Sequence, residues 1–392
     1  MLIILLLMIF TSCNDEEIIK PNQISNTQNN NLLITEEYAR QIASNISFEN
    51  LNSDSNYGVN LKNTVPNHNK KIDTLLIIPD NNNKPALYII NYKDGGFIVL
   101  AGDRRSEPIL AFSEINSFDL DQNYYPSGLI GWLFDSKENI TRLRNANVSI
   151  SPGLENQWDN LEHGLTDVIS CKLIEDPGED CTPYTIQVGP LLQTIWDQDC
   201  GYNSETPSMS CVPCYHAYTG CVATAMAQVM RYHQYPNNYN WSGMPNDYGN
   251  AAIATLMRDI GDFVNMDYSC DGSSAELGEI ASSFTNDFGY STATTADYYH
   301  NTVKSELSQS RPVILTGGRN TGWWIFGQFS DGHAWVCDGF LNYVDPCYGS
   351  FLKFNMNWGW GGSYNGWYSF NNFNPGEHTF NYKRRIVYNI KP

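Results

Sequence analysis

Residues 219–228, which read TGCVATAMAQ, constrain the fold of this chain more than any other segment. Large apolar residues recur from there at the spacing of one helix face, with alanines between them: Val222, Met226, Val229 and Met230. This periodicity predicts an amphipathic helix. Proline cannot continue a helix, so we expect the helix to begin at Cys221 and to end before Pro236.

A cysteine in the first turn of a helix has a chemical consequence. The unpaired N–H groups and the positive end of the helix dipole stabilise a thiolate, which lowers the pKa of a thiol from about 8.5 toward neutrality. We therefore expect Cys221 to be a nucleophile. A buried structural cysteine or half of a disulfide fits this segment alone equally well, because free cysteine is among the most buried residue types.

A nucleophilic cysteine needs a general base, and the chain has 7 histidines. His233 lies twelve residues along the same predicted helix, about 18 Å away at about 1.5 Å per residue, and is excluded. His216 lies five residues upstream in an irregular, cysteine-flanked stretch and stays a weaker alternative. Four others lie in polar surroundings without a matching partner: His68, His163, His300 and His378. His333 remains as the predicted base.

His333 begins a run of residues typical of a β-strand, and a second such run follows at 351–358. A turn-rich connection separates the two, so we expect a hairpin folded about Asp345 that places His333 opposite Asn357. An imidazole that takes a proton from a thiol needs a group that fixes its orientation. The amide oxygen of Asn357 is predicted to be that group.

Two further residues complete the predicted site. Acyl transfer needs hydrogen-bond donors aimed at the developing oxyanion, and the backbone N–H of Cys221 can be one of them. The side-chain amide of Gln198 is a candidate for the second donor. Trp358, in the segment NWGWGG, would shield the histidine from water, although tryptophan and glycine also simply pack turns.

Several separated blocks, taken in order, resemble the streptopain family of papain-like cysteine peptidases. The blocks are 191–203, 219–225, 232–236, 332–334 and 357–362. The resemblance covers roughly residues 186–392. Upstream, segments 87–92 and 95–106 resemble the inhibitory propeptide of the same family.

The resemblance implies an α+β fold, in which a papain-like catalytic domain follows a small α+β propeptide domain. The catalytic domain would have a helical subdomain and an antiparallel β subdomain with the active-site cleft between them. Enzymes of this family cleave peptide bonds and favour an apolar side chain two residues before the scissile bond. Neither a metal nor another cofactor is expected.

The resemblance also implies roles for particular residues. It makes Cys221 the nucleophile, His333 the base and Gln198 an oxyanion donor. It places Asn357 and Trp358 beside the histidine. Two substrate contacts are added by the same resemblance, Ser274 in a substrate-binding loop and Gly332 next to the histidine.

The 10 cysteines depart from this family, whose streptopain-type members are poor in cysteine. Setting Cys221 and Cys13 aside leaves an even number, which favours disulfides: Cys171, Cys181, Cys200, Cys211, Cys214, Cys270, Cys337 and Cys347. The alternative is a zinc site, because Cys211 and Cys214 have ligand-like spacing and His216 is close. No second pair at matching spacing follows.

The N-terminus predicts export. Residues 1–12 form an apolar run too short to span a bilayer and resemble a signal peptide, although no Lys or Arg precedes the run, so the true start could lie upstream. Thr11 and Ser12 before Cys13 resemble a lipoprotein cleavage box, after which Cys13 would be lipidated. The acidic residues that follow resemble a signal for the outer cell surface. An ordinary secretory signal with an incidental Cys13 is the alternative.

The length of the chain indicates several domains, and its net charge argues against one class of partner. A chain of 392 residues suggests two or three folded units. The net charge of −19 without a basic cluster argues against nucleic acid. We predict five parts: a signal peptide (1–12), a flexible tether after the lipidated cysteine (13–34), an inhibitory propeptide domain (35–150), a processing linker (151–185) and a papain-like peptidase domain (186–392).

Local patterns predict the elements of both domains. Thr35 is expected to cap a helix, and strands are expected at 73–78, 87–92, 97–101 and 109–112. In the second domain we expect amphipathic helices at 253–260 and 277–288, followed by an antiparallel sheet or barrel with strands at 313–316, 333–341, 351–358 and 367–370.

The sequence thus predicts an exported, lipid-anchored cysteine endopeptidase made as a zymogen. Its partners would be polypeptide substrates, its own propeptide as an intramolecular inhibitor, and a membrane only through the lipid. Two other functions stay open: a cell-wall amidase or acyltransferase with the same Cys–His dyad, and a non-enzymatic, disulfide-rich surface binding lipoprotein.

Overall fold

A computed structural model describes most of the chain. The described residues are 32–46, 48, 70–122, 125–146, 148–162, 184–270, 272–317, 333–345, 349–369 and 385–392. The predicted signal peptide and lipidated Cys13 lie outside these residues, as does Gly332. Within the described residues, no helix has the length and apolar character needed to cross a bilayer.

The N-terminal part is a helix packed on an antiparallel meander. Thr35 caps helix α1 (Glu36–Asn45) as predicted, its hydroxyl accepting the N–H of Tyr38 at 3.2 Å. The four predicted strands are confirmed, with small differences in length: β1 (Ile72–Pro79), β2 (Pro85–Tyr92), β3 (Phe97–Ala101) and β4 (Ile109–Ser113). Neighbouring strands in this series pair antiparallel.

Two further helices, α3 (Ser127–Asn145) and α4 (Pro152–Glu162), follow the meander. Helix α3 packs against strands of both parts of the chain, β2 on one side and β7 and β8 on the other. Helix α4 lies within segment 151–185, which we predicted as a processing linker. Its first residue is Pro152, at a helix position where proline is tolerated.

The C-terminal part contains a helical group and most of the sheet. Its helices are α5 (Cys221–His233), α6 (Ala251–Phe263), α7 (Glu279–Asn286) and α8 (His300–Leu307), with short 3₁₀ turns η2 (Pro213–Tyr215) and η3 (Trp241–Gly243). Its strands are β5 (Tyr184–Val188), β6 (Thr292–Asp297), β7 (Val313–Gly317), β8 (His333–Asp345), β9 (Gly349–Asn357), β10 (Gly366–Ser369) and β11 (Arg385–Lys391). Helix α5 begins at Cys221, as predicted.

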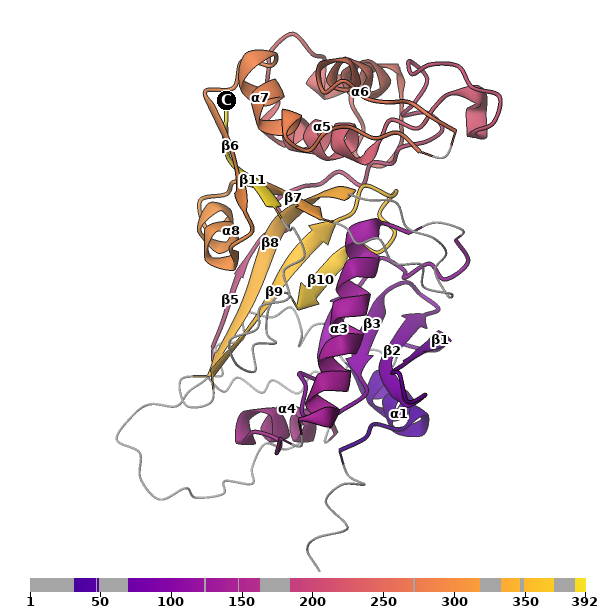
Figure 1. The fold of residues 1–392 in the computed structure, drawn as a ribbon, viewed down its shortest axis with the longest axis vertical. Coiled ribbons are helices and arrows are strands. Elements are labelled where there is room, and N and C mark those ends of the chain that lie inside the picture. Colours follow the sequence, from indigo (N-terminus) through magenta and orange to yellow (C-terminus); the bar gives the residue numbers. More distant parts are fainter. Residues whose placement is uncertain are drawn as a thin grey trace, which may run out of the picture.

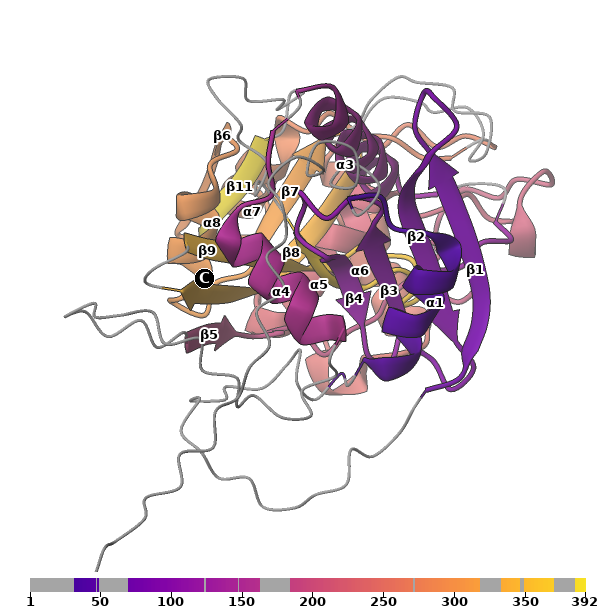
Figure 2. The same ribbon diagram turned by 90° about the horizontal axis from the view of Figure 1, so that it is seen from below.

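One sheet runs through both parts in the order β1-β2-β3-β4-β10-β9-β8-β7-β11-β6, with β5 pairing on β8. The two parts join where β4 pairs with β10, Phe112 opposite Trp367 and Ala111 opposite Tyr368. Figure 1 shows α5, α6 and α7 gathered at one end of the molecule, with α1 and β1 to β3 toward the other, and Figure 2 shows α1 in front of strands β1 to β4. The propeptide sheet is therefore continuous with the catalytic sheet.

Two hydrophobic cores follow from this arrangement. One lies between α5, α6, α7 and the catalytic sheet and contains Met226, Leu256 and Phe284. The other is shared by the N-terminal part and the catalytic sheet, with Phe97 and Trp358 among its members. Because the second core crosses the boundary between the parts, their stabilities are coupled.

The hairpin of β8 and β9 differs from the prediction in its register. Val336, not His333, lies opposite Asn357, while His333 pairs with Gly317 of β7. The strands run on to Asp345 and resume at Gly349, so the turn is centred after Asp345. A bulge between Cys337 and Gly339 shifts the pairing by one residue in the opposite direction, toward His333, which is too little to restore the predicted register.

Candidate active site

Cys221 occupies the first position of α5, after a backbone turn that suits glycine. Gly220 has φ +86°, and a Cβ there would lie 2.7 Å from Met266 Sδ. The thiol is not in a disulfide. Ala334 is the second residue of β8, and its backbone N–H donates to Cys221 Sγ at 3.4 Å. The sulfur therefore lies against the peptide that directly follows His333.

The His333 imidazole is buried, and one of its two ring nitrogens contacts a backbone carbonyl. Its Nε2 lies 3.0 Å from the carbonyl oxygen of Trp358. A carbonyl only accepts, so Nε2 carries the proton and Nδ1 is the nitrogen left to act as a base. The ring of Trp335 stacks on the imidazole, with centroids 6.0 Å apart and planes at 14°, and Trp335 in turn packs against Trp358.

Burial controls the charge of both groups in this precursor. Burial lowers the pKa of His333 to about 4, against the opposing effect of the Trp358 carbonyl. Cys221 as a whole is only partly buried, but burial of the thiol raises its pKa, although backbone N–H groups, with Ala334 first, act in the opposite direction. The lowered thiol pKa expected from the helix start is thus wrong for this form, because desolvation exceeds the effect of the helix.

Gln198 lies beside the start of α5. Its backbone carbonyl accepts the N–H of Thr219 at 2.9 Å, which ties its segment to the turn before Cys221. Its side-chain Nε2 donates to the carbonyl of Gly359 at 3.3 Å. Next to it, burial and then the charge of Asp199 raise the pKa of Asp197 to about 6. The structure thus brings the Gln198 amide to the segment that also contacts His333.

Asn357 does not contact the imidazole, contrary to the predicted orientation. Its Nδ2 donates to the carbonyl of Thr194 at 2.7 Å and to Gln228 Oε1 at 3.1 Å, and its Oδ1 accepts the N–H of Gly359 at 3.2 Å. The physical reason is the register of the hairpin, which places Val336 opposite Asn357. The contact with His333 is made instead by the neighbouring backbone carbonyl of Trp358.

Trp358 is completely buried under the histidine. Its indole N–H donates to the carbonyl of Tyr364 at 3.1 Å, and its backbone N–H donates to Asn365 Oδ1 at 2.9 Å. Both bonds fix the peptide whose carbonyl accepts from His333. Trp358 therefore lies beside the histidine, as the sequence resemblance implied.

Ser274 is exposed on a loop that folds back toward the nucleophile. Its backbone N–H and carbonyl pair with Asp267 at 3.1 and 2.8 Å. The neighbouring Ser273 hydroxyl donates to the carbonyl of Tyr218 at 2.6 Å, which holds the loop against the turn before Cys221. The predicted substrate loop thus borders the turn before Cys221, while Gly332 lies outside the described residues.

Two disulfides brace this region, Cys200–Cys214 and Cys211–Cys270. The second joins the segment before α5 to the loop of Ser274. The two cysteines of the predicted zinc alternative thus belong to different disulfides. Within the described residues, His, Cys, Asp and Glu side chains form no group of three suited to a metal.

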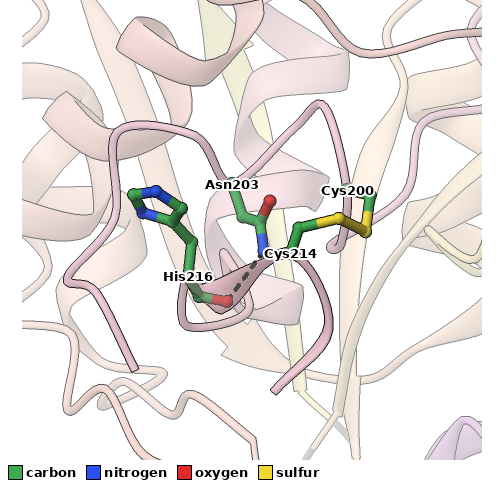
Figure 3. Close-up of a disulfide and its surroundings, with 4 residues drawn as sticks. All are labelled: Cys200, Asn203, Cys214 and His216. Carbon is green, nitrogen blue, oxygen red and sulfur yellow. Dashed lines mark hydrogen bonds between the residues drawn. A yellow bond between two sulfur atoms is a disulfide. The ribbon is translucent and has the colours of Figure 1, made fainter. Parts of the chain in front are cut away.

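The structure also describes Cys337, predicted to form a disulfide, and His216, the alternative base. Cys337, expected in a disulfide, is free and buried in the shared core. Cys171, Cys181 and Cys347 lie outside the described residues. Nδ1 of His216, the alternative base, lies 2.8 Å from the Thr206 carbonyl. Figure 3 shows Asn203 donating to the His216 carbonyl and the imidazole pointing away from the Cys200–Cys214 disulfide.

Comparisons with known proteins agree with this geometry. Residues 196–368 match the sequence model of the Peptidase C10 family, and residues 31–140 match that of the Spi protease inhibitor. Streptopain of Streptococcus pyogenes is 27% identical over 367 residues, which cover 78% of this chain and 81% of streptopain.

Two further relatives come from other bacteria. The thiol protease/hemagglutinin PrtT of Porphyromonas gingivalis is 27% identical over 334 residues, which cover 72% of this chain and 33% of PrtT. The structure of a prointerpain A fragment from Prevotella intermedia superposes with a TM-score of 0.56 at 25% identity, covering 81% of this chain and 99% of the fragment.

A free thiol at a helix start, next to a histidine on an antiparallel sheet, defines a papain-like cysteine peptidase. With its inhibitor domain in place, it is a zymogen. The chain is similar to the Peptidase C10 family over residues 196–368 and to streptopain over most of its length, and it is a cysteine-type endopeptidase.

Proposed function

We propose that this endopeptidase hydrolyses peptide bonds through a Cys221 thioester, with His333 as the general base. The observation that carries the proposal is the hydrogen bond from Ala334 N–H to Cys221 Sγ, which brings the thiol to the strand residue next to His333. Cys–His pairs of this kind activate the thiol as a nucleophile. In the precursor both groups are neutral, so the proposed activity requires release of the propeptide.

The proposed reaction begins when Cys221 Sγ attacks the scissile carbonyl while its proton passes to His333 Nδ1. The backbone N–H of Cys221 and the amide of Gln198 stabilise the oxyanion. When the C–N bond breaks, the imidazolium gives its proton to the leaving amine and the thioester remains. A water, deprotonated by His333, then attacks the thioester, releasing the acid and restoring the thiol.

The proposed specificity is for substrates with an apolar side chain two residues before the scissile bond. This part rests on the resemblance to the streptopain family and on the position of the Ser274 loop, which contacts Tyr218, before Cys221, through Ser273. Ser274 would lie near the cleft, and Gly332 would hydrogen-bond the substrate backbone. Paired peptides with Val or Asp at that position would test it, with a higher kcat/KM expected for Val.

The proposed location is outside the cytoplasm, on the outer membrane through lipidated Cys13 and facing the cell surface, with release of the enzyme after propeptide removal. The support is the apolar run before Cys13 and the acidic residues after it. A Cys13→Ala variant should move from the membrane fraction to a soluble fraction. An unchanged distribution would favour an ordinary secretory signal.

The decisive experiment compares wild type with Cys221→Ser on casein and on purified peptidoglycan, after propeptide removal. Cleavage of casein by wild type alone is expected. Cleavage of peptidoglycan alone would indicate an amidase. If wild type cleaves neither substrate, the Cys–His proposal fails and a binding function becomes the better explanation.

A further inference from the structure

Gln228 is a buried polar residue on the helix that carries the nucleophile. It lies two turns after Cys221, on the same face of α5, and has no exposed surface. A buried amide is costly without hydrogen-bond partners, whereas an apolar side chain would fill the same space without that cost. The partners of Gln228 therefore indicate what the residue does.

The carboxamide of Gln228 binds two segments outside its own helix. Its Oε1 accepts from the Thr194 hydroxyl at 3.0 Å and from the backbone N–H of Trp196 at 3.3 Å. It also exchanges two hydrogen bonds with the amide of Asn357, Nε2 to Oδ1 at 3.2 Å and Nδ2 to Oε1 at 3.1 Å. One side chain thus joins α5 to the segment before Gln198 and to the end of β9.

Backbone groups fix the direction of both amides. The N–H of Trp196 can only donate, so the atom that faces it must be the oxygen of Gln228. The N–H of Gly359 in the same way selects the oxygen of Asn357, and the carbonyl of Thr194 selects its nitrogen. The pair is therefore complementary, and neither amide can turn over without losing bonds.

The residues held by this pair are those that contact the reacting groups. Asn357 starts a segment of three residues, 357–359, and the next two carbonyls in it accept from predicted catalytic side chains. The Trp358 carbonyl accepts from His333 Nε2 at 3.0 Å, and the Gly359 carbonyl accepts from Gln198 Nε2 at 3.3 Å. A shift of this segment relative to α5 would move the imidazole and the oxyanion donor together.

We propose that Gln228 is a positioning residue for the peptidase reaction. Through Asn357 it holds segment 357–359, and hence His333 and Gln198, in place relative to Cys221. This inference rests on the proposed roles of Cys221 and His333. It adds a residue that touches neither substrate nor a reacting atom.

The test replaces Gln228 with methionine, which has a similar volume and forms no such bonds. Each precursor is processed with immobilised wild-type enzyme, which is then removed, and kcat and KM are measured on one peptide. We expect Gln228→Met to lower kcat roughly 100-fold, because displacement of a catalytic group by about 1 Å has an effect of that order. KM should change much less, and the acidic limb of the kcat/KM profile should shift.

The matched control is Val229→Ala, which leaves a cavity in the helical core at the neighbouring, equally buried position. It should lower the melting temperature without lowering kcat. If Gln228→Met does not fold, Gln228→Glu replaces it, since this isosteric variant loses the Nε2 donor, and the same direction of change in kcat is expected.

A double-mutant cycle gives the second readout. Because Gln228 acts through Asn357, adding Gln228→Met to Asn357→Ala should lower kcat little further. The inference is overturned if the two losses multiply, or if Gln228→Met keeps the kcat of Val229→Ala. An inactive wild type would instead overturn the proposed function, so the two failures are distinguishable.

Discussion

At the residue scale, the Cys221 thiol lies against the peptide that follows His333, and both the thiol and the imidazole are uncharged in the precursor. Burial shifts each pKa toward the neutral form, upward for Cys221 and downward to about 4 for His333. We expect removal of the propeptide to admit water, which would reverse both shifts. The chemistry of these two residues therefore reports whether the propeptide is in place.

Labelling of Cys221 by a thiolate-specific electrophile should follow this change. Near pH 6 we expect the processed enzyme to react quickly and the precursor slowly, since the precursor thiol is protonated. In the processed enzyme, His333→Ala should reduce labelling to the rate of the precursor. The rate is followed by intact mass. Unchanged labelling of the His333→Ala enzyme would remove His333 from the mechanism.

The stability of the precursor should also depend on pH through His333. The folded pKa of about 4 lies below the unfolded value near 6.5. Between these values the unfolded chain binds the proton and the folded one does not, so the free energy of unfolding falls as pH falls, by up to about 3 kcal/mol. In a Cys221→Ala background, His333→Gln should flatten this fall. His233 also has a folded pKa of about 4, so its contribution remains.

At the element scale, helix α3 links the inhibitor domain to the histidine. The helix approaches so closely at Gly128 that a Cβ there would lie 2.5 Å from Trp335 Cζ3. Trp335 is the ring that stacks on His333. Further along α3, Trp132 Nε1 donates to the Ser369 carbonyl at 2.7 Å. Helix α3 thus covers the histidine strand through one tryptophan.

Adding a single methyl group at Gly128 should therefore weaken inhibition by the inhibitor domain. Gly128→Ala is expected to displace α3 from Trp335 and to speed the appearance of activity in the precursor. Gly131→Ala is the matched control, because a Cβ at Gly131 meets no atom within 4 Å. Both changes favour the helix by up to about 1 kcal/mol, so they differ only in the contact. Equal activation rates would contradict the role of this contact.

At the scale of the whole molecule, the propeptide and the enzyme form one folded unit. The sheet crosses between them at β4 and β10. Aromatic rings also meet across the boundary, Phe118 with Tyr364 at 5.0 Å and Trp132 with Tyr368 at 4.9 Å. A buried ion pair between Glu107 and Lys353 adds a polar contact. The inhibitor domain therefore shares the hydrophobic core that stabilises the catalytic sheet.

The Cys221→Ala precursor should consequently unfold in one cooperative transition. Processed enzyme should melt at a lower temperature, because removal of the propeptide exposes Tyr364 and Tyr368 and leaves the β10 edge unpaired. Differential scanning calorimetry of both forms would measure this. Two separate transitions in the precursor would indicate that the shared core contributes little coupling.

Local sequence determined much of what the structure contains. The helix that starts at Cys221, the cap at Thr35 and the strands at 87–92 and 97–101 could be predicted because each depends on residues a few positions apart. The same local signals did not predict α4, which begins at Pro152. The inhibitor function came from resemblance to a family, not from composition.

Only the tertiary structure decided how distant segments meet. The register in which β8 and β9 pair near their turn moved His333 away from Asn357, and no local pattern reports such a shift. Likewise, the sequence allowed many pairings of cysteines, and folding left Cys337 free while joining Cys211 to Cys270. Gln228 became informative for the same reason, since its partners lie on segments 32 to 129 residues away. The chain by itself specified which groups could react, and packing set the distances and charges that control them.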